Sequence, residues 1–190
     1  IAAAMAPRLA ALAGGEAWSD DGATEALDLA LWEANRAILR VAGEAEGCDG
    51  MGATAVALLA LDGKAAICHV GDCRAYLLHA GELSRLTEDQ TLARRMVELG
   101  TLRPEEAEGH QAASQVAQAL GRQYDLEPSR RLLPLSPGDA VLLCCDGLHG
   151  QVSDETIKQA LAGDDAAARL AKLADDAGGA DNCTVAVARF

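Results

Sequence analysis

The sequence predicts an α+β fold in which sheet layers are flanked by helices. The spacing of apolar residues changes from helical to strand-like after about residue 50, and strand-like and helical segments then alternate along the chain. The strand-like segments are too apolar to be exposed on both faces, so helices or a second sheet must cover at least one face. With 190 residues, of which 50% are hydrophobic, we expect a single domain over residues 1–190.

The N-terminal half predicts helices first and then strands. Leu9 and Leu12 indicate a short amphipathic helix, and Thr24 is the expected N-cap of a longer helix that ends near Gly43. The Asp62-Gly63 pair is a hairpin turn signal between two apolar runs. We expect an antiparallel meander of four strands, at residues 54–61, 64–72, 73–81 and 82–87.

The second half begins with a polar region that predicts a helical flap insert at about residues 87–121, with Pro104 at a helix start. Its expected helical segments are residues 89–100, 103–110 and 114–121. Strands are then predicted at residues 131–135, 139–147 and 182–190. Between the last two strands, helices are expected to begin near Ser153 and near Asp164.

Composition excludes several classes of function. The formal net charge of −13 makes binding to nucleic acid or to anionic lipid unfavourable. No apolar run is long enough to cross a bilayer, and we expect no membrane segment. The six cysteines contain no C-x2-C pair, which argues against a zinc knuckle and fits a reducing, cytoplasmic location. Four of them lie in apolar strand-like runs, where a thiol packs as a small hydrophobic group: Cys68, Cys144, Cys145 and Cys183.

Residues 68–74 fit two incompatible phosphatase signatures. Cys68, five intervening residues and Arg74 match the C-x5-R loop of cysteine-dependent phosphatases, whereas Asp72 lies in an acidic turn between two apolar runs. A cysteine phosphatase loop needs a helix directly after the arginine, to direct backbone N–H groups at phosphate. The residues after Arg74 indicate a strand and a hairpin instead, and a thiol inside a strand is buried. The context therefore favours the carboxylate over the thiolate.

Three aspartates occupy equivalent places, each at the boundary of an apolar strand. Asp72 follows one strand, Asp146 ends the run "LLCCDGL", and Asp181 precedes the final strand. Sheet edges gather such side chains at one rim, where carboxylates repel one another unless cations lie between them. Oxygen ligands of this kind suit Mg²⁺ or Mn²⁺. The alternative is that each aspartate only caps a turn, since Asp-Gly and Asp-Asn are common turn pairs.

The ordered set of motifs resembles the PPM-type, or type 2C, metal-dependent serine/threonine protein phosphatases, with bacterial members looking most similar. Each motif is moderately specific, but the order covers nearly the whole chain. The motifs are "GMGATAVALL" (50–59), "HVGDCRAYLL" (69–78), "LTEDQTL" (86–92), "ALG" (119–121), "PGDAVLLCCDGL" (137–148) and "GGADNCTVAV" (178–187).

The resemblance implies an αββα sandwich of two antiparallel sheets and hydrolysis of phosphoserine and phosphothreonine by a water bound to two Mn²⁺ or Mg²⁺ ions. Matched residue by residue, Asp146 and Asp181 would be metal ligands, and Asp72 would join a third, weaker metal site. The flap would influence substrate choice. The implied partners are phosphoproteins, such as a serine/threonine kinase or its targets.

The family's N-terminal strands, with an "ED" ligand, a phosphate-binding Arg and a "DGxGG" metal turn, have no counterpart here. Asp49 in "CDGMGAT" imitates that turn, but it precedes a strand rather than a helix. Either the remaining ligands lie outside this sequence, in which case the 190-residue chain alone is expected to be inactive, or the protein is a catalytically inactive phosphatase-fold regulatory or binding module.

Overall fold

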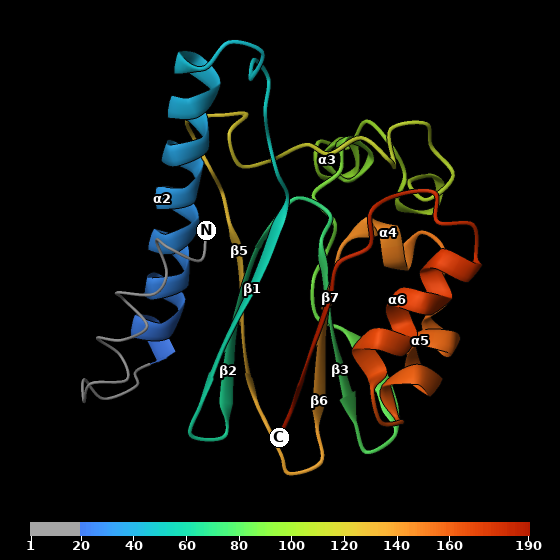
Figure 1. Ribbon diagram of the computed structural model, residues 1–190. Helices are drawn as coiled ribbons and strands as arrows, with labels where there is room; N and C mark the ends of the chain where they lie inside the picture. The colour runs from blue at the N-terminus through green and yellow to red at the C-terminus, as the bar shows by residue number, and fades with distance from the viewer. Residues whose placement is uncertain (1–19) are drawn as a thin grey trace.

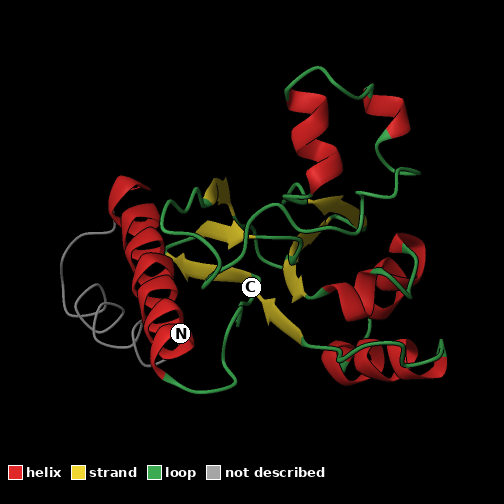
Figure 2. Cartoon of the chain, turned by 90° about the horizontal axis from the view of Figure 1, so that it is seen from above, coloured by secondary structure: helices red, strands yellow, loops and turns green. Residues whose placement is uncertain are grey.

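The computed structural model describes residues 20–190, which form a four-layer arrangement of helix, sheet, sheet and helices (Figure 1). Helix α2 covers the outer face of one sheet, and α4, α5 and α6 cover the outer face of the other (Figures 1 and 2). The predicted αββα architecture is therefore confirmed. In chain order the elements are α2 (Asp20–Glu44), β1 (Ala55–Leu61), β2 (Lys64–Val70), β3 (Arg74–His79), β4 (Glu82–Arg85), α3 (Leu92–Glu98), the 3₁₀ helix η1 (Pro104–Glu106), β5 (Ser129–Pro134), β6 (Ala140–Cys144), α4 (Asp146–His149), α5 (Asp154–Leu161), α6 (Ala166–Asp176) and β7 (Val185–Arg189).

Both sheets are antiparallel, with strand orders β1-β2-β5 and β4-β3-β6-β7. The hairpin at Asp62-Gly63 is confirmed, because both residues have positive φ and β1 pairs with β2 from Leu61↔Lys64 onward. The expected four-stranded meander is wrong. Strands β2 and β3 belong to different sheets, and the chain crosses from one to the other at Gly71-Asp72.

Side chains that alternate along the strands fill three apolar layers. On the outer face of the first sheet, Leu27 and Leu31 of α2 pack over Cys68. The space between the sheets holds a smaller cluster of Ile67, Ala75 and Leu86, with partly buried Val56, Leu58, Leu77, Leu133 and Leu143 around it. The outer face of the second sheet packs against α4, α5 and α6 through a third cluster that includes Leu142, Ile157 and Leu170. Two sheets covered on both faces explain why the strand sequences are so continuously apolar.

Three helix predictions need correction or qualification. Thr24 lies inside α2 and is not its N-cap. Residues 114–121 form no helix, because Val116 bridges to Thr91 and Leu120 bridges to Ala53, and these tertiary contacts override the local helix propensity. The short helix expected around Leu9 and Leu12 lies outside the described residues.

The other helix predictions are confirmed. The Ser153 side chain accepts a hydrogen bond from the Thr156 N–H at the start of α5, and α6 follows the Asp164-Asp165 turn. Pro104 begins η1 within the flap. None of the helices in residues 20–190 is long and apolar enough to span a membrane.

Candidate metal centre

Asp72 lies on the turn by which the chain leaves the first sheet and enters the second. Gly71 has φ +93°, and a Cβ atom there would lie 2.3 Å from Thr54 Cγ2, so the turn requires glycine. The Gly71 N–H donates to Gln90 Oε1 at 2.8 Å, and the Gln90 N–H donates to the Gly71 carbonyl at 3.0 Å. These reciprocal bonds fix the backbone that carries Asp72 against the beginning of the flap.

Asp146 is the first residue of α4, directly after the buried strand β6. Its Oδ1 atom accepts a hydrogen bond from the Gly147 N–H at 3.0 Å, and the side chain stays exposed. Gly147 packs so closely on the Asp181 loop that a Cβ atom there would lie 2.2 Å from the Asn182 carbonyl oxygen. Sequence reasoning placed Asp146 before a glycine turn. The close approach to the Asp181 loop explains why that turn carries glycine.

Asp181 lies on the loop between α6 and β7 and is exposed, with Oδ1 accepting from the Asn182 N–H at 2.7 Å. The Cys145 thiol ties this loop to the Asp146 turn. Cys145 Sγ donates to the Asn182 carbonyl at 3.3 Å and accepts from the Thr184 N–H at 3.1 Å. The loops that carry Asp146 and Asp181 are therefore direct neighbours.

His149 connects the third loop to the other two, because its Nε2 atom lies 3.0 Å from the Asp72 carbonyl oxygen. This contact fixes a tautomer in which Nε2 carries the proton. Burial, followed by the positive charge of Arg74, lowers the pKa of His149, which keeps the ring neutral. Sequence analysis did not assign His149 a role. Its position three residues after Asp146, on the same turn of helix, was the available signal.

The Asp72 carboxyl group is affected both by burial and by the charge of Asp146. Burial raises the pKa of Asp72 above its ordinary value, and the negative charge of Asp146 raises it further. A carboxyl group whose ionisation is disfavoured by burial and by a neighbouring negative charge lies at a site where a divalent cation would be stabilised. The structure thus brings together the three loops that the sequence singled out. The role of the three aspartates as metal ligands stays a prediction.

We expect Asp72→Asn to stabilise the metal-free protein at neutral pH. A raised pKa in the folded state means that the folded chain holds more protons than the unfolded chain, so the free energy of unfolding falls as pH rises from the unfolded pKa through the folded one. Asparagine removes that loss. Thermal unfolding in a chelator should show a higher Tm for Asp72→Asn than for wild type at pH 7, and a smaller difference at pH 4. Asp164→Asn, at an exposed turn position, should show no such trend, and a lower Tm of Asp72→Asn at pH 7 would contradict the assignment.

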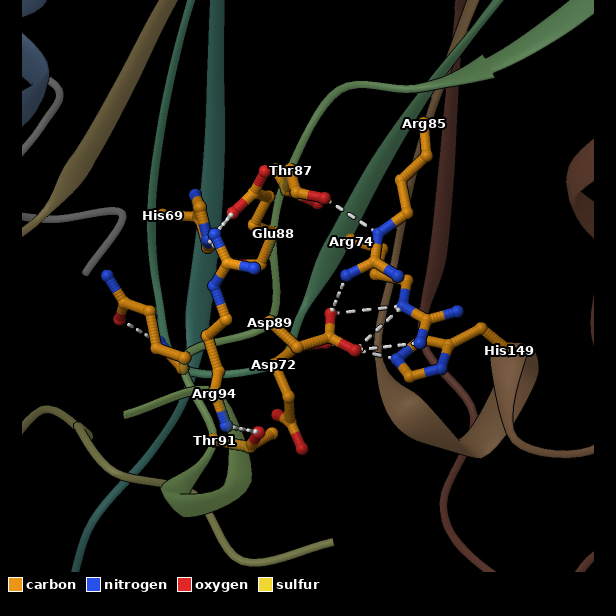
Figure 3. A network of polar contacts seen from close by, with 12 residues as sticks. His69, Asp72, Arg74, Arg85, Thr87, Glu88, Asp89, Thr91, Arg94 and His149 are labelled. Atoms are coloured by element: carbon orange, nitrogen blue, oxygen red, sulfur yellow. Dashed lines mark hydrogen bonds and ion pairs between the residues drawn. The ribbon is translucent and has the colours of Figure 1, made fainter. Parts of the chain in front are cut away.

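A network of ion pairs supports the rim from the side of the flap (Figure 3). Arg74 forms a two-pronged contact with Asp89, with Nη2 at 2.7 Å from Oδ2 and Nε at 3.0 Å from Oδ1. Arg85 also contacts Asp89, at 2.6 Å. Arg74 Nη1 donates to the Tyr76 hydroxyl, which in turn donates to Asp154 of α5. Sequence analysis missed Asp89, whose only signal was an acidic residue near the start of the expected flap.

The C-x5-R interpretation fails on geometry, as the sequence context indicated. Cys68 faces α2 in the outer layer of the first sheet, and burial followed by the nearby Asp28 carboxylate raises the pKa of its thiol to about 12. Arg74 belongs to the second sheet and is engaged with Asp89. The two residues therefore cannot form one phosphate-binding loop.

Oxygen donors at the rim fit Mg²⁺ or Mn²⁺ in chemical type. Their number falls short of a complete cage, because residues 20–190 contain no group of three or more His, Cys, Asp or Glu side chains that could hold a metal ion. Asp49, the imitation of a metal turn, lies exposed on the turn after α2. The described part of the chain thus supplies an acidic rim rather than a closed metal site.

Comparison with known proteins agrees with the two-sheet sandwich. The family model described as "Protein phosphatase 2C" matches residues 3–181. The chain belongs to this family of serine/threonine protein phosphatases, and the resemblance seen in its motifs is confirmed.

Two curated relatives and one solved structure illustrate the similarity. The serine/threonine protein phosphatase PstP of Mycobacterium tuberculosis is 40% identical over 165 residues, which cover 85% of this chain and 32% of PstP. Protein phosphatase PhpP of Streptococcus pneumoniae is 35% identical over 149 residues, covering 76% of this chain and 61% of PhpP. The crystal structure of the PstP catalytic domain in complex with two manganese ions has a TM-score of 0.76 and 36% identity, covering 97% of this chain and 77% of that one. The chain therefore spans less than two thirds of the length of these curated relatives.

Proposed function

We propose that this chain belongs to a Mn²⁺- or Mg²⁺-dependent phosphatase that hydrolyses phosphoserine and phosphothreonine in proteins. In this proposal Asp146 and Asp181 are ligands of a binuclear centre, and Asp72 joins a third, weaker site. The observation that carries the proposal is the meeting of the three loops, tied by the His149 contact to Asp72 and by the Cys145 contacts to Asn182 and Thr184. The manganese ions of the PstP complex support the choice of metal.

Bound Mn²⁺ or Mg²⁺ would supply the positive charge that activates water and stabilises the phosphoryl oxygens. The chain's own residues hold the carboxylates in place before any ion binds. Gly71 and Gly147 permit the close backbone approaches, and the Asp89 network holds Arg74 beside the rim. Such support around a metal ligand matters, because loss of an outer contact commonly weakens metal affinity about 10–100-fold.

The flap beside this rim would influence substrate choice. Its helix α3 exposes Arg94 and Arg95, but both are paired with carboxylates of Glu88 or Glu98. A phosphopeptide would therefore have to compete with these ion pairs. We further propose a cytoplasmic enzyme whose substrates are a serine/threonine kinase or the targets of that kinase.

A second candidate, a phosphatase-fold regulatory or binding module without turnover, is favoured by one observation. The described residues supply no complete group of three metal-ligating side chains. A rim with two or three carboxylates binds divalent ions weakly, because affinity follows the charge of the ligands.

The test compares the complete gene product with the 190-residue chain in a phosphate-release assay on a phosphothreonine peptide. We expect the complete protein to release phosphate with Mn²⁺ and to stop in a chelator, while the 190-residue chain stays at background. Loss of the rate in a chelator would also exclude a cysteine-dependent phosphatase, whose rate would be indifferent to chelators. A complete protein that binds the peptide but releases no phosphate in Mn²⁺ would establish the module instead.

A further inference from the structure

Two cysteines directly flank the aspartates of the rim and come from neighbouring strands. Cys73 follows Asp72, and Cys145 precedes Asp146. Strands β3 and β6 are antiparallel with Arg74 opposite Cys144, so one step beyond this pair Cys73 lies opposite Cys145. Both residues line the same cavity of about 440 Å³, together with Thr54, Leu143 and Ala186. The two thiols therefore belong to one face of the second sheet.

The hydrogen-bond pattern shows which kind of cross-strand pair this is. Ala75 directs its N–H to Thr87 Oγ1 and its carbonyl to the Leu86 N–H, both away from β6. Pairs alternate along an antiparallel ladder, so Arg74–Cys144 is the hydrogen-bonded pair and Cys73–Cys145 occupies a non-hydrogen-bonded position. Such positions bring opposite Cα atoms to about 4.5 Å, which lies within the range that a disulfide bridges.

Two further cysteines lie in this region, and Cys144 also lines this cavity. Cys144 belongs to the apolar cluster under α4, α5 and α6, and Cys183 packs against that same cluster. In the reduced protein Cys73 Sγ lies 3.2 Å from Thr54 Oγ1, and Cys145 Sγ is held by the backbone of Asn182 and Thr184. Rotation about the Cα–Cβ bond of Cys145 is the movement that would release it toward Cys73.

We propose that Cys73 and Cys145 form a peroxide-sensitive thiol pair that closes to a cross-strand disulfide. Cys145 is partly exposed while Cys73 is only 7% exposed, so peroxide reaches Cys145 first. Hydrogen peroxide oxidises the Cys145 thiol to a sulfenic acid and is itself reduced to one water. The Cys73 sulfur then attacks the Cys145 sulfur, the S–O bond breaks, and a second water leaves with the Cys73 proton. Two electrons pass from the two thiols to one peroxide, and an added dithiol can reduce the disulfide back to the two thiols by thiol–disulfide exchange.

The disulfide changes the rim in two ways. It covalently joins the residue after Asp72 to the residue before Asp146, and it removes the Cys145 contacts that hold the Asp181 loop. The consequence for metal binding, unlike the disulfide itself, rests on the function proposed above. If the rim binds Mn²⁺ as proposed, we expect oxidation to weaken Mn²⁺ binding about tenfold. Loss of a contact that supports a metal ligand has an effect of this size.

The experiment maps disulfides in the whole chain after hydrogen peroxide treatment. Trypsin should yield a dithiothreitol-sensitive link between the peptide of residues 65–74 and the peptide of residues 132–158. These peptides also contain Cys68 and Cys144, which makes them matched controls. We expect the link to vanish in Cys73→Ser and in Cys145→Ser, and to persist in Cys68→Ala and in Cys144→Ala.

A wild-type chain that forms no link, or that links residues 132–158 to the Cys183 peptide instead, overturns the proposal even if a serine variant fails to fold. Mn²⁺ titration by calorimetry tests the proposed metal function separately from the proposed thiol pair. If the disulfide forms but neither the reduced nor the oxidised complete protein binds Mn²⁺, the proposed metal function fails and the thiol pair stands. If the reduced and the oxidised protein bind Mn²⁺ equally well, the claim that the disulfide weakens Mn²⁺ binding is overturned.

Discussion

Replacing Asp146 by Ala in the complete protein is expected to lower the rate of Mn²⁺-dependent phosphate release by at least about 100-fold. Loss of a group that merely supports a metal ligand commonly costs about 10–100-fold in affinity or activity, so loss of a ligand should cost no less. Asp146 is exposed at the start of α4, and removal of its carboxylate deletes its local contact with the Gly147 N–H. We therefore expect the fold to persist. The measurement is initial rate against Mn²⁺ concentration, with circular dichroism to verify folding.

Asp181→Ala should behave in the same way, because Asp181 occupies the neighbouring loop and is also exposed. The matched control is Asp49→Ala, which removes an exposed aspartate from the sequence that imitates a metal turn. Its rate should equal that of wild type. A folded Asp146→Ala protein with an undiminished rate would rule out our ligand assignment, and a loss in Asp49→Ala would show that the ligand was assigned to the wrong turn.

The strands and hairpins were predictable because their signals are local. Continuous apolar runs on either side of the Asp62-Gly63 pair define β1 and β2 without reference to the rest of the chain. The sheet that a strand joins is not determined by local sequence signals. The continuous apolar run through Val70 gave no sign that β3 belongs to the other sheet, since strands covered on both faces look alike in either. The helix expected at residues 114–121 failed for a related reason, because its bridges to Ala53 and Thr91 are distant in sequence.

At the rim, sequence predicted which loops meet but not what holds them together. Asp72, Asp146 and Asp181 each follow or precede a strand, and strand ends on neighbouring positions must converge. The supporting contacts come from side chains that have no motif of their own: His149, Cys145, Gln90 and Asp89. Their partners are mostly backbone atoms, whose positions exist only once the chain has folded. Whether residues 87–121 act as a substrate-selecting flap stays a prediction.

Gly71→Ala is expected to lower the free energy of unfolding by about 3 kcal/mol. The left-handed φ of +93° at Gly71 costs a side-chain-bearing residue about 1–2 kcal/mol. The new Cβ would also lie 2.3 Å from Thr54 Cγ2, and overpacking of this kind adds about 1–3 kcal/mol. Chemical denaturation of the variant and of wild type measures the difference.

Gly81→Ala isolates the conformational part of that cost. Gly81 has a similar φ of +80°, but no atom would lie within 4 Å of its Cβ, so we expect a loss of only about 1 kcal/mol. Adding Thr54→Ser to Gly71→Ala removes the closest methyl group while keeping the hydroxyl that contacts Cys73, and it should recover part of the lost stability. Equal losses in the two glycine variants would mean that the approach of Gly71 to Thr54 does not constrain the sheet crossing. Because Gly71 carries the Asp72 turn, its variant should also bind Mn²⁺ more weakly, whereas the Gly81 variant should not.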